Sequence, residues 1–272
     1  MNRQWRLGLS SGACGGRPIG HVLPAIRTSG VTGVEIGTSR GHFAPSQPEE
    51  VAALASSLAG MGLAAVAIHA PFGEGLDLAD VDPRSRQAAV SAIVDSARAI
   101  GALGGSLVVV HPSGLERQQH VPAARLDDCV RSLETLTRCC EDLGVRLVVE
   151  TPLPHLIGGR PEEFSWLLGR AADTVGVCLD TGHVHLIDAW QPFLDVAGAR
   201  LCHVHVHDNR GSWDDHLPPG EGHINWAHIA ATLTAADYEG WLMLELACPP
   251  GDLADEFAKA IRRTAALFEP VA

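Results

Sequence analysis

The sequence predicts an α/β fold in which parallel strands close into one (β/α)8 barrel, and three observations support this. Short apolar runs alternate with longer segments of helical periodicity, which is typical of parallel strands connected by helices. A chain of 272 residues with 46% hydrophobic residues has the size of one such barrel. Several apolar runs end in a histidine or a carboxylate, as expected where all strands open toward one mouth. We therefore expect a single domain spanning residues 1–272.

Eight apolar runs are the expected strands. Aliphatic and β-branched side chains dominate them, and turn residues separate them from the helical segments. The eight are Arg6–Ser10, Gly33–Gly37, Ala64–His69, Leu107–His111, Arg146–Glu150, Val175–Asp180, Leu201–His207 and Trp241–Glu245.

Seven helices are expected between and after these strands. Four of them begin at or just after a proline, where the missing N–H of proline costs least. Gly60, Gly144 and Gly240 lie between a helix and the next strand, which is consistent with helix ends or tight turns. The helices are Pro48–Gly60, Pro83–Leu103, Pro122–Leu143, Pro161–Arg170, Ala189–Ala197, Trp226–Ala236 and Leu253–Phe268. Eight strands with these helices predict a TIM barrel.

An open, doubly wound sheet is the alternative fold. Such a sheet normally has a glycine-rich phosphate-binding turn after its first strand. The segment Ser10–Gly16 is rich in glycine but matches no nucleotide-binding pattern, and we interpret it as a flexible loop. The longest irregular stretch is His207–Asn225, and long loops inside compact domains are often functional.

Composition excludes several classes of protein. A net charge of −12, from 20 basic and 32 acidic residues, argues against binding of duplex DNA by mainly electrostatic attraction. Seven cysteines without a CxxC pair indicate reduced thiols. No signal peptide and no apolar run of membrane-spanning length are evident. We expect a cytoplasmic protein without membrane association, and the oligomeric state is left open.

Nine side chains of metal-ligand type lie at or near the ends of the expected strands. Ionised carboxylates ending buried strands are costly to desolvate unless they are paired, and a divalent cation supplies that pairing. Imidazoles mixed with carboxylates suit Zn, Mn, Fe or Co rather than Ca. The nine are His69, His111, Glu150, Asp180, His183, His205, Asp214, His216 and Glu245.

The ordered motifs around these residues resemble those of the endonuclease IV and xylose-isomerase-like TIM-barrel superfamily, which includes AP endonuclease family 2 and sugar phosphate isomerase/epimerase-like proteins. The motifs are HAPFG at His69, VVVHPSG at His111, VVETP at Glu150, LDTGH at Asp180, HVHD at His205, DDHLPPGEG at Asp214 and LE at Glu245. The resemblance spans residues 33–245.

The endonuclease IV pattern implies up to three zinc ions. It assigns His69, His111 and a bridging Glu150 to the first. The second set is Glu150, Asp180, His205 and Glu245. The third set is His183, Asp214 and His216. Isomerases and epimerases of the superfamily resemble the second set alone, with one metal.

The resemblance implies two functions, and a third of a different class stays open. The preferred one is metal-dependent hydrolysis of a small phosphodiester or sugar phosphate, because several cations can stabilise the charges of phosphoester cleavage. The alternative is a sugar or sugar-phosphate isomerase or epimerase with Glu150 and Glu245 as the acid/base pair, and His183 is a further candidate catalytic residue. The third is a metal-stabilised barrel without catalysis.

Other residues are expected to contact substrate or support ligands. Arg40 in GTSRGHF and Arg210 in HDNRG are candidate substrate contacts, although Arg210 is one residue closer to His205 than in some epimerases. His203, His205 and His207 alternate, so all three point to one side of their strand. We expect His203 in the core and His207 beside a ligand or the substrate. Asp208 is expected to orient a ligand imidazole and Glu35 to lie near the mouth, while the chain after His69 lacks the tyrosine of DNA-binding relatives.

Overall fold

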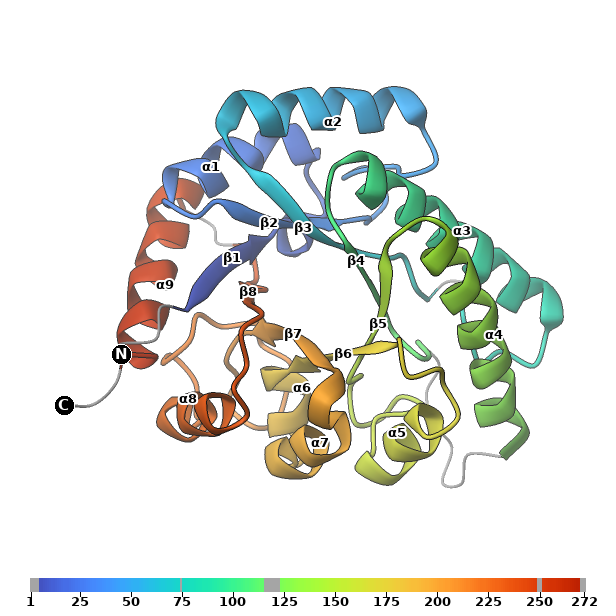
Figure 1. Ribbon diagram of the computed structural model, residues 1–272. Helices are drawn as coiled ribbons and strands as arrows, with labels where there is room; N and C mark the ends of the chain where they lie inside the picture. The colour runs from blue at the N-terminus through green and yellow to red at the C-terminus, as the bar shows by residue number, and fades with distance from the viewer. Residues whose placement is uncertain (1–4, 74, 115–122, 249–250, 270–272) are drawn as a thin grey trace.

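The computed structural model describes residues 5–73, 75–114, 123–248 and 251–269. Within them, eight parallel strands form a closed barrel in chain order, surrounded by helices (Figure 1). The strands are β1 (Arg6–Ser10), β2 (Gly33–Gly37), β3 (Ala64–His69), β4 (Leu107–Val110), β5 (Arg146–Glu150), β6 (Gly176–Asp180), β7 (Leu201–Val206) and β8 (Trp241–Leu244). β1 pairs with β8 from Arg6↔Trp241 to Leu9↔Leu244, which closes the barrel. The predicted TIM barrel is confirmed.

All seven helices expected from the sequence form, and each ends within two residues of the expected bounds. The expected start at Pro122 lies outside the described residues. The helices are α1 (Leu23–Thr28), α2 (Pro48–Met61), α3 (Pro83–Ala102), α4 (Ala123–Asp142), α5 (Pro161–Leu168), α6 (Thr181–His185), α7 (Trp190–Ala197), α8 (Trp226–Ala235) and α9 (Leu253–Leu267). In the described part of the chain, none has the length and hydropathy to cross a membrane.

Three local features differ from the expectation. α1 and α6 have only six and five residues, so neither shows a periodicity that sequence reading detects. The glycine-rich segment after β1 is ordered into a short 3₁₀ helix, Gly12–Cys14, rather than an open loop. α2 ends at Met61 instead of Gly60, because the next residue, Gly62, has the left-handed conformation (φ 64°) that glycine adopts at a helix end.

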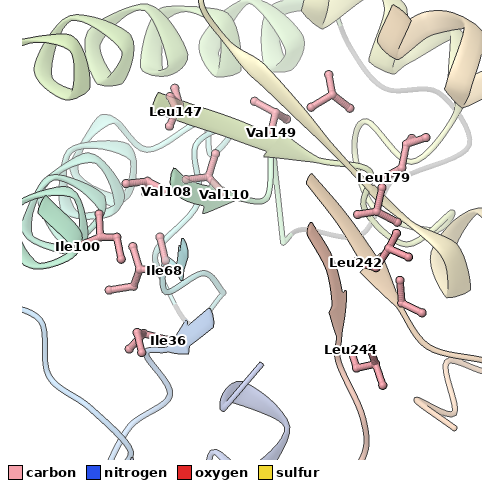
Figure 2. Packing of buried hydrophobic residues seen from close by; sticks show 14 of the residues in the cluster. Ile36, Ile68, Ile100, Val108, Val110, Leu147, Val149, Leu179, Leu242 and Leu244 are labelled. Atoms are coloured by element: carbon pink, nitrogen blue, oxygen red, sulfur yellow. The ribbon is translucent and has the colours of Figure 1, made fainter. Parts of the chain in front are cut away.

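The hydrophobic core lies between the strands and the helices. Side chains alternate along each strand, so Val108 and Val110 of β4 point to the helices and Val109 points into the barrel. Figure 2 shows the outer layer, in which strand residues such as Ile68 face helix residues such as Ile100. A smaller cluster of buried residues fills part of the barrel interior. Its members are Ala67, Val109, Val148 and Cys178.

Candidate metal centre

The strand ends bring the nine predicted ligands together at one end of the barrel. Seven of them line a cavity of about 550 Å³: His69, His111, Glu150, His183, Asp214, His216 and Glu245. The other two, Asp180 and His205, are fully buried and lie beside these residues. Because the carboxyl ends of parallel strands meet at one mouth, residues almost 180 positions apart become neighbours.

The first group joins β3, the end of β4 and β5. Nε2 of His69 lies 3.0 Å from Oε2 of Glu150, and Nε2 of His111 lies 3.1 Å from the same oxygen. The ring of Phe72 stacks on that of His111, with 3.9 Å between the ring centroids and 8° between the ring planes. Phe72 is 47% exposed, so it forms an apolar wall between the first group and solvent.

The second group lies deeper and contains Glu150, Asp180, His205 and Glu245, each offering an atom within 4.8 Å of the others. Nδ1 of His205 lies 3.2 Å from Oε1 of Glu150, 3.8 Å from Oδ2 of Asp180 and 3.4 Å from Oε2 of Glu245. One imidazole nitrogen therefore faces three carboxylates. Asp180 also caps α6, because its Oδ1 accepts a hydrogen bond from the backbone N–H of His183.

The third group combines α6 with the long loop after β7. Oδ2 of Asp214 lies 3.4 Å from Nε2 of His183 and 3.0 Å from Nε2 of His216. The backbone of His216 has φ 48°, a conformation that costs energy outside glycine and often occurs at functional sites. His207 belongs to this group as well, stacked on His216 at 4.0 Å.

The far nitrogens of three cavity imidazoles donate to backbone carbonyls. Nδ1 of His69 donates to the carbonyl of Ala70, Nδ1 of His183 to that of Thr151, and Nδ1 of His216 to that of Glu245. This arrangement turns each Nε2 toward the carboxylates, where it can donate an N–H to them or, once deprotonated, bind a cation. Metal-binding histidines are usually oriented in this way.

The donor set fits a divalent cation. Oε1 of Glu150, Nδ1 of His205 and Oδ1 of Asp214 are buried and have no hydrogen-bond partner within the described part of the chain. Unpaired buried polar atoms are costly. The first two lie 3.2 Å apart in the second group, and the third lies in the third group, 3.8 Å from Nδ1 of His207. A cation in the second group, between mixed imidazole and carboxylate ligands, would satisfy Oε1 of Glu150 and Nδ1 of His205.

The network of charges shifts the pKa values of these groups. Burial lowers the pKa of His69, but the hydrogen bond and charge of Glu150 outweigh it and raise the pKa to about 9. For His183, burial is likewise outweighed by Asp180 and Asp214, and the pKa rises to about 10. Burial raises the pKa of Glu150, but His111 and His205 reverse the effect and hold it well below its usual value. Without a cation, protonated imidazoles therefore balance the carboxylates.

A further group lies below the cavity, inside the barrel. Glu35 on β2 is fully buried, and its Oε2 accepts hydrogen bonds from Nε2 of His203 at 3.0 Å and of His205 at 3.1 Å. Burial raises the pKa of Glu35, but the two imidazoles outweigh it and lower the pKa. Glu35 thereby directs Nδ1 of His205 at the second group. His203 lies in the core, as expected.

The remaining candidates fall in different places. Arg40 lines the cavity and is the only lysine or arginine among the described residues that does so. Arg210 is exposed and is not among the lining residues, so its contact with substrate stays a prediction. His207 is buried behind the cavity with Nε2 3.0 Å from both oxygens of Asp180, and its link to the third group was not predicted.

Asp208 has a different position from the one expected. Its carboxylate accepts hydrogen bonds from the backbone N–H groups of Gly220 and Ile224 and from the indole of Trp226. It therefore organises the loop between β7 and α8 rather than orienting a ligand imidazole. The stacking of Phe72 on His111 was also missed, although an aromatic residue three positions after His69 is a visible signal.

The fold and the site define a (β/α)8 barrel whose mouth gathers histidines and carboxylates. The chain belongs to the family of xylose isomerase-like TIM barrels, because the model of that family matches residues 23–267. The resemblance recognised in the sequence is confirmed.

Curated relatives share this family. An uncharacterised protein of Methanocaldococcus jannaschii is 29% identical over 188 residues, which cover 66% of this chain and 64% of that protein. This chain thus spans slightly less than two thirds of that relative's length. A probable endonuclease 4 of Mycoplasma genitalium is 28% identical over 133 residues, covering 48% of this chain and 44% of that protein.

Solved structures share the whole fold. A D-tagatose 3-epimerase-like protein superposes with a TM-score of 0.83 and 23% identity, covering 97% of this chain and 98% of that chain. D-psicose 3-epimerase from Clostridium cellulolyticum H10, solved with D-tagatose, superposes with a TM-score of 0.81 and 17% identity. The match covers 97% of this chain and 100% of that chain.

The preferred prediction of phosphoester hydrolysis is contradicted by these neighbours, which are sugar epimerases and favour the alternative isomerase or epimerase function. The prediction rested on the number of ligand-type residues. In the structure, however, His69 and His111 share Glu150, and His183 and His216 share Asp214. Such pairing accounts for these residues without three cations, so their number does not determine the reaction.

Proposed function

We propose that this protein is a divalent-metal-dependent epimerase or isomerase of keto sugars. The observation that carries the proposal is the group of Glu150, Asp180, His205 and Glu245, whose ligand atoms lie within 4.8 Å of one another below a cavity of about 550 Å³. Zn, Mn, Fe or Co would suit this donor set and would polarise the carbonyl and hydroxyl oxygens of a bound sugar.

Glu150 and Glu245 are the proposed acid/base pair. Both line the cavity, on β5 and directly after β8, so they approach its contents from different directions. One carboxylate removes the proton from the carbon next to the carbonyl, and the other returns a proton to the opposite face. The configuration at that carbon is thereby inverted.

The cavity suits a small, polar and weakly charged substrate. Its lining combines apolar side chains such as Phe72 and Leu153 with Arg40 and the imidazole of His183. Pockets of this size hold a small molecule, with a few polar groups setting its orientation. We assign His183 and Arg40 to the sugar hydroxyl groups. The first and third groups also offer ligand-type atoms within 4.8 Å of one another, and elemental analysis of the purified protein would count the cations bound.

The function is tested by incubating metal-loaded protein with a panel of ketoses and ketose phosphates, including D-tagatose and D-psicose. Chromatography of the products should reveal interconversion of one epimer or isomer pair, lost on chelation and restored by Mn, Co or Zn. If no sugar is converted with any of these ions, the proposal is wrong.

Metal affinity should increase with pH. Burial lowers the pKa of His205, the imidazole of the second group, but the neighbouring Cys178, Glu35 and Glu150 outweigh it and hold the pKa well above its usual value. A cation bound in this group must therefore displace a proton from His205. For each displaced proton, the affinity for the metal should therefore fall by about tenfold per pH unit as the pH falls from 8.5 to 6.5. Competition with a chelator measures this, and an affinity independent of pH would contradict it.

Glu35→Gln should weaken metal binding by roughly 10–100-fold, as changes beside a ligand histidine typically do. The amide removes the charge that holds His205 with Nδ1 directed at the second group. Chelator competition on the variant measures the effect, and Glu162→Gln on the exposed face of α5 is the control. If the variant folds and binds metal within twofold of the wild type, Glu35 has no such role.

A further inference from the structure

The loops after the first and last strands bring two thiols into contact. Cys14 ends the 3₁₀ helix after β1, and Cys248 lies three residues beyond Glu245, after β8. Their sulfur atoms are 2.7 Å apart although both cysteines are free. This separation is shorter than the usual contact of unbonded sulfurs and longer than a disulfide bond of about 2.05 Å. The two loops therefore hold the thiols in direct contact.

We propose that Cys14 and Cys248 are a modification site, at which a reversible disulfide closes the seam of the barrel between β1 and β8. These strands pair directly, and Figure 1 shows them side by side. The bond would join residues 234 positions apart, so it would enclose most of the chain in one covalent loop. The proposal does not depend on the sugar chemistry proposed above.

The two thiols have different roles in forming the bond. Cys14 is 2% exposed, and burial together with the neighbouring Cys248 raises its pKa to about 12. Cys248 is half-buried, so it is the thiol that an external oxidant meets first. The sequence contains five other cysteines, but in the described residues only this pair has sulfurs in contact.

The oxidant required is a small-molecule disulfide such as oxidised glutathione. The Cys248 thiolate attacks one sulfur of that disulfide, forming a mixed disulfide and releasing one small thiol. Cys14 then loses its proton and attacks Sγ of Cys248, which releases the second small thiol. The protein loses two hydrogens and the small disulfide gains them, so reduced glutathione in excess reverses the reaction.

The bond would also restrain the cavity wall. Gly12, in the same 3₁₀ helix as Cys14, and Glu245 both line the cavity. The segment from Glu245 to Cys248 contacts the loop after β7, because the N–H of Ala247 donates to the carbonyl of His216 and Nδ1 of His216 donates to the carbonyl of Glu245. Oxidation would add a covalent restraint to this segment.

The test equilibrates the full-length protein with mixtures of oxidised and reduced glutathione, blocks the remaining thiols and digests with trypsin without reduction. Peptides 7–27 and 211–259 each contain a single cysteine, Cys14 and Cys248 respectively, because trypsin does not cleave between Arg17 and Pro18. We expect these peptides to become cross-linked, the number of free thiols to fall by two from seven, and Tm to rise by roughly 5 °C. Reductant should reverse all three changes.

Matched variants make the result specific. Cys14→Ser and Cys248→Ser should each abolish the cross-link, whereas Cys139→Ser on α4 should keep it. The proposal is overturned if all seven thiols stay reduced at every glutathione ratio. It is also overturned if Cys248 stops at the mixed disulfide with glutathione.

Discussion

Glu150→Gln is expected to abolish both sugar turnover and tight metal binding. The carboxylate is fully buried, and one of its oxygens contacts His69 and His111 while the other faces His205. The amide has no negative charge and turns N–H donors toward imidazoles, so it removes a ligand and a proton carrier together. Turnover should fall by at least about 10³-fold.

The same variant is expected to lose stability when metal is absent. Removing one partner of a buried ionic contact leaves the other uncompensated, at a cost of roughly 3–5 kcal/mol. Thermal unfolding of the chelated protein measures this, and a circular dichroism spectrum checks the fold. Glu162→Gln, on the exposed side of α5, should change neither property. A Glu150→Gln protein with normal metal content and turnover would remove Glu150 from the site.

Much of the fold could be predicted because its signals are local. Aliphatic runs define the strands, and proline begins α2, α3 and α5 as expected. The convergence of His69, Glu150 and Asp180 also follows from topology, because every strand of a parallel barrel ends at the same face. Neither inference requires knowledge of side-chain contacts.

What could not be predicted depends on contacts across the barrel. Glu35 meets His203 and His205, which lie 168 and 170 positions away, and their pairing depends on barrel closure and on a register shift between Val34 and Glu35. The reaction type was missed for a related reason. The sequence does not distinguish an imidazole that binds a cation from one that is hydrogen-bonded to a carboxylate. The structure makes this distinction for His205, because its Nδ1 is buried and has no hydrogen-bond partner.

Glu245→Gln is expected to reduce proton transfer far more than folding or metal binding, because the other three ligand residues of the second group remain. Its side chain is 16% exposed at the edge of the second group, 3.4 Å from Nδ1 of His205, so its replacement leaves the buried ligands in place. The backbone carbonyl that accepts the hydrogen bond of His216 is also retained. Turnover should fall by roughly 10²–10⁴-fold while Tm changes little.

Isotope exchange in deuterated water shows which carboxylate serves which face of the sugar. With Glu150 intact, the Glu245→Gln protein should still exchange the reactive proton of one epimer with solvent while failing to form the other epimer. The wild type should exchange both. Two separate carboxylates predict this one-sided exchange, because each reaches only one face of the substrate carbon. Two results would contradict this: exchange of both epimers by the variant, or turnover within tenfold of the wild type. Either would mean that a single group carries the proton and that Glu245 only binds the cation or the sugar.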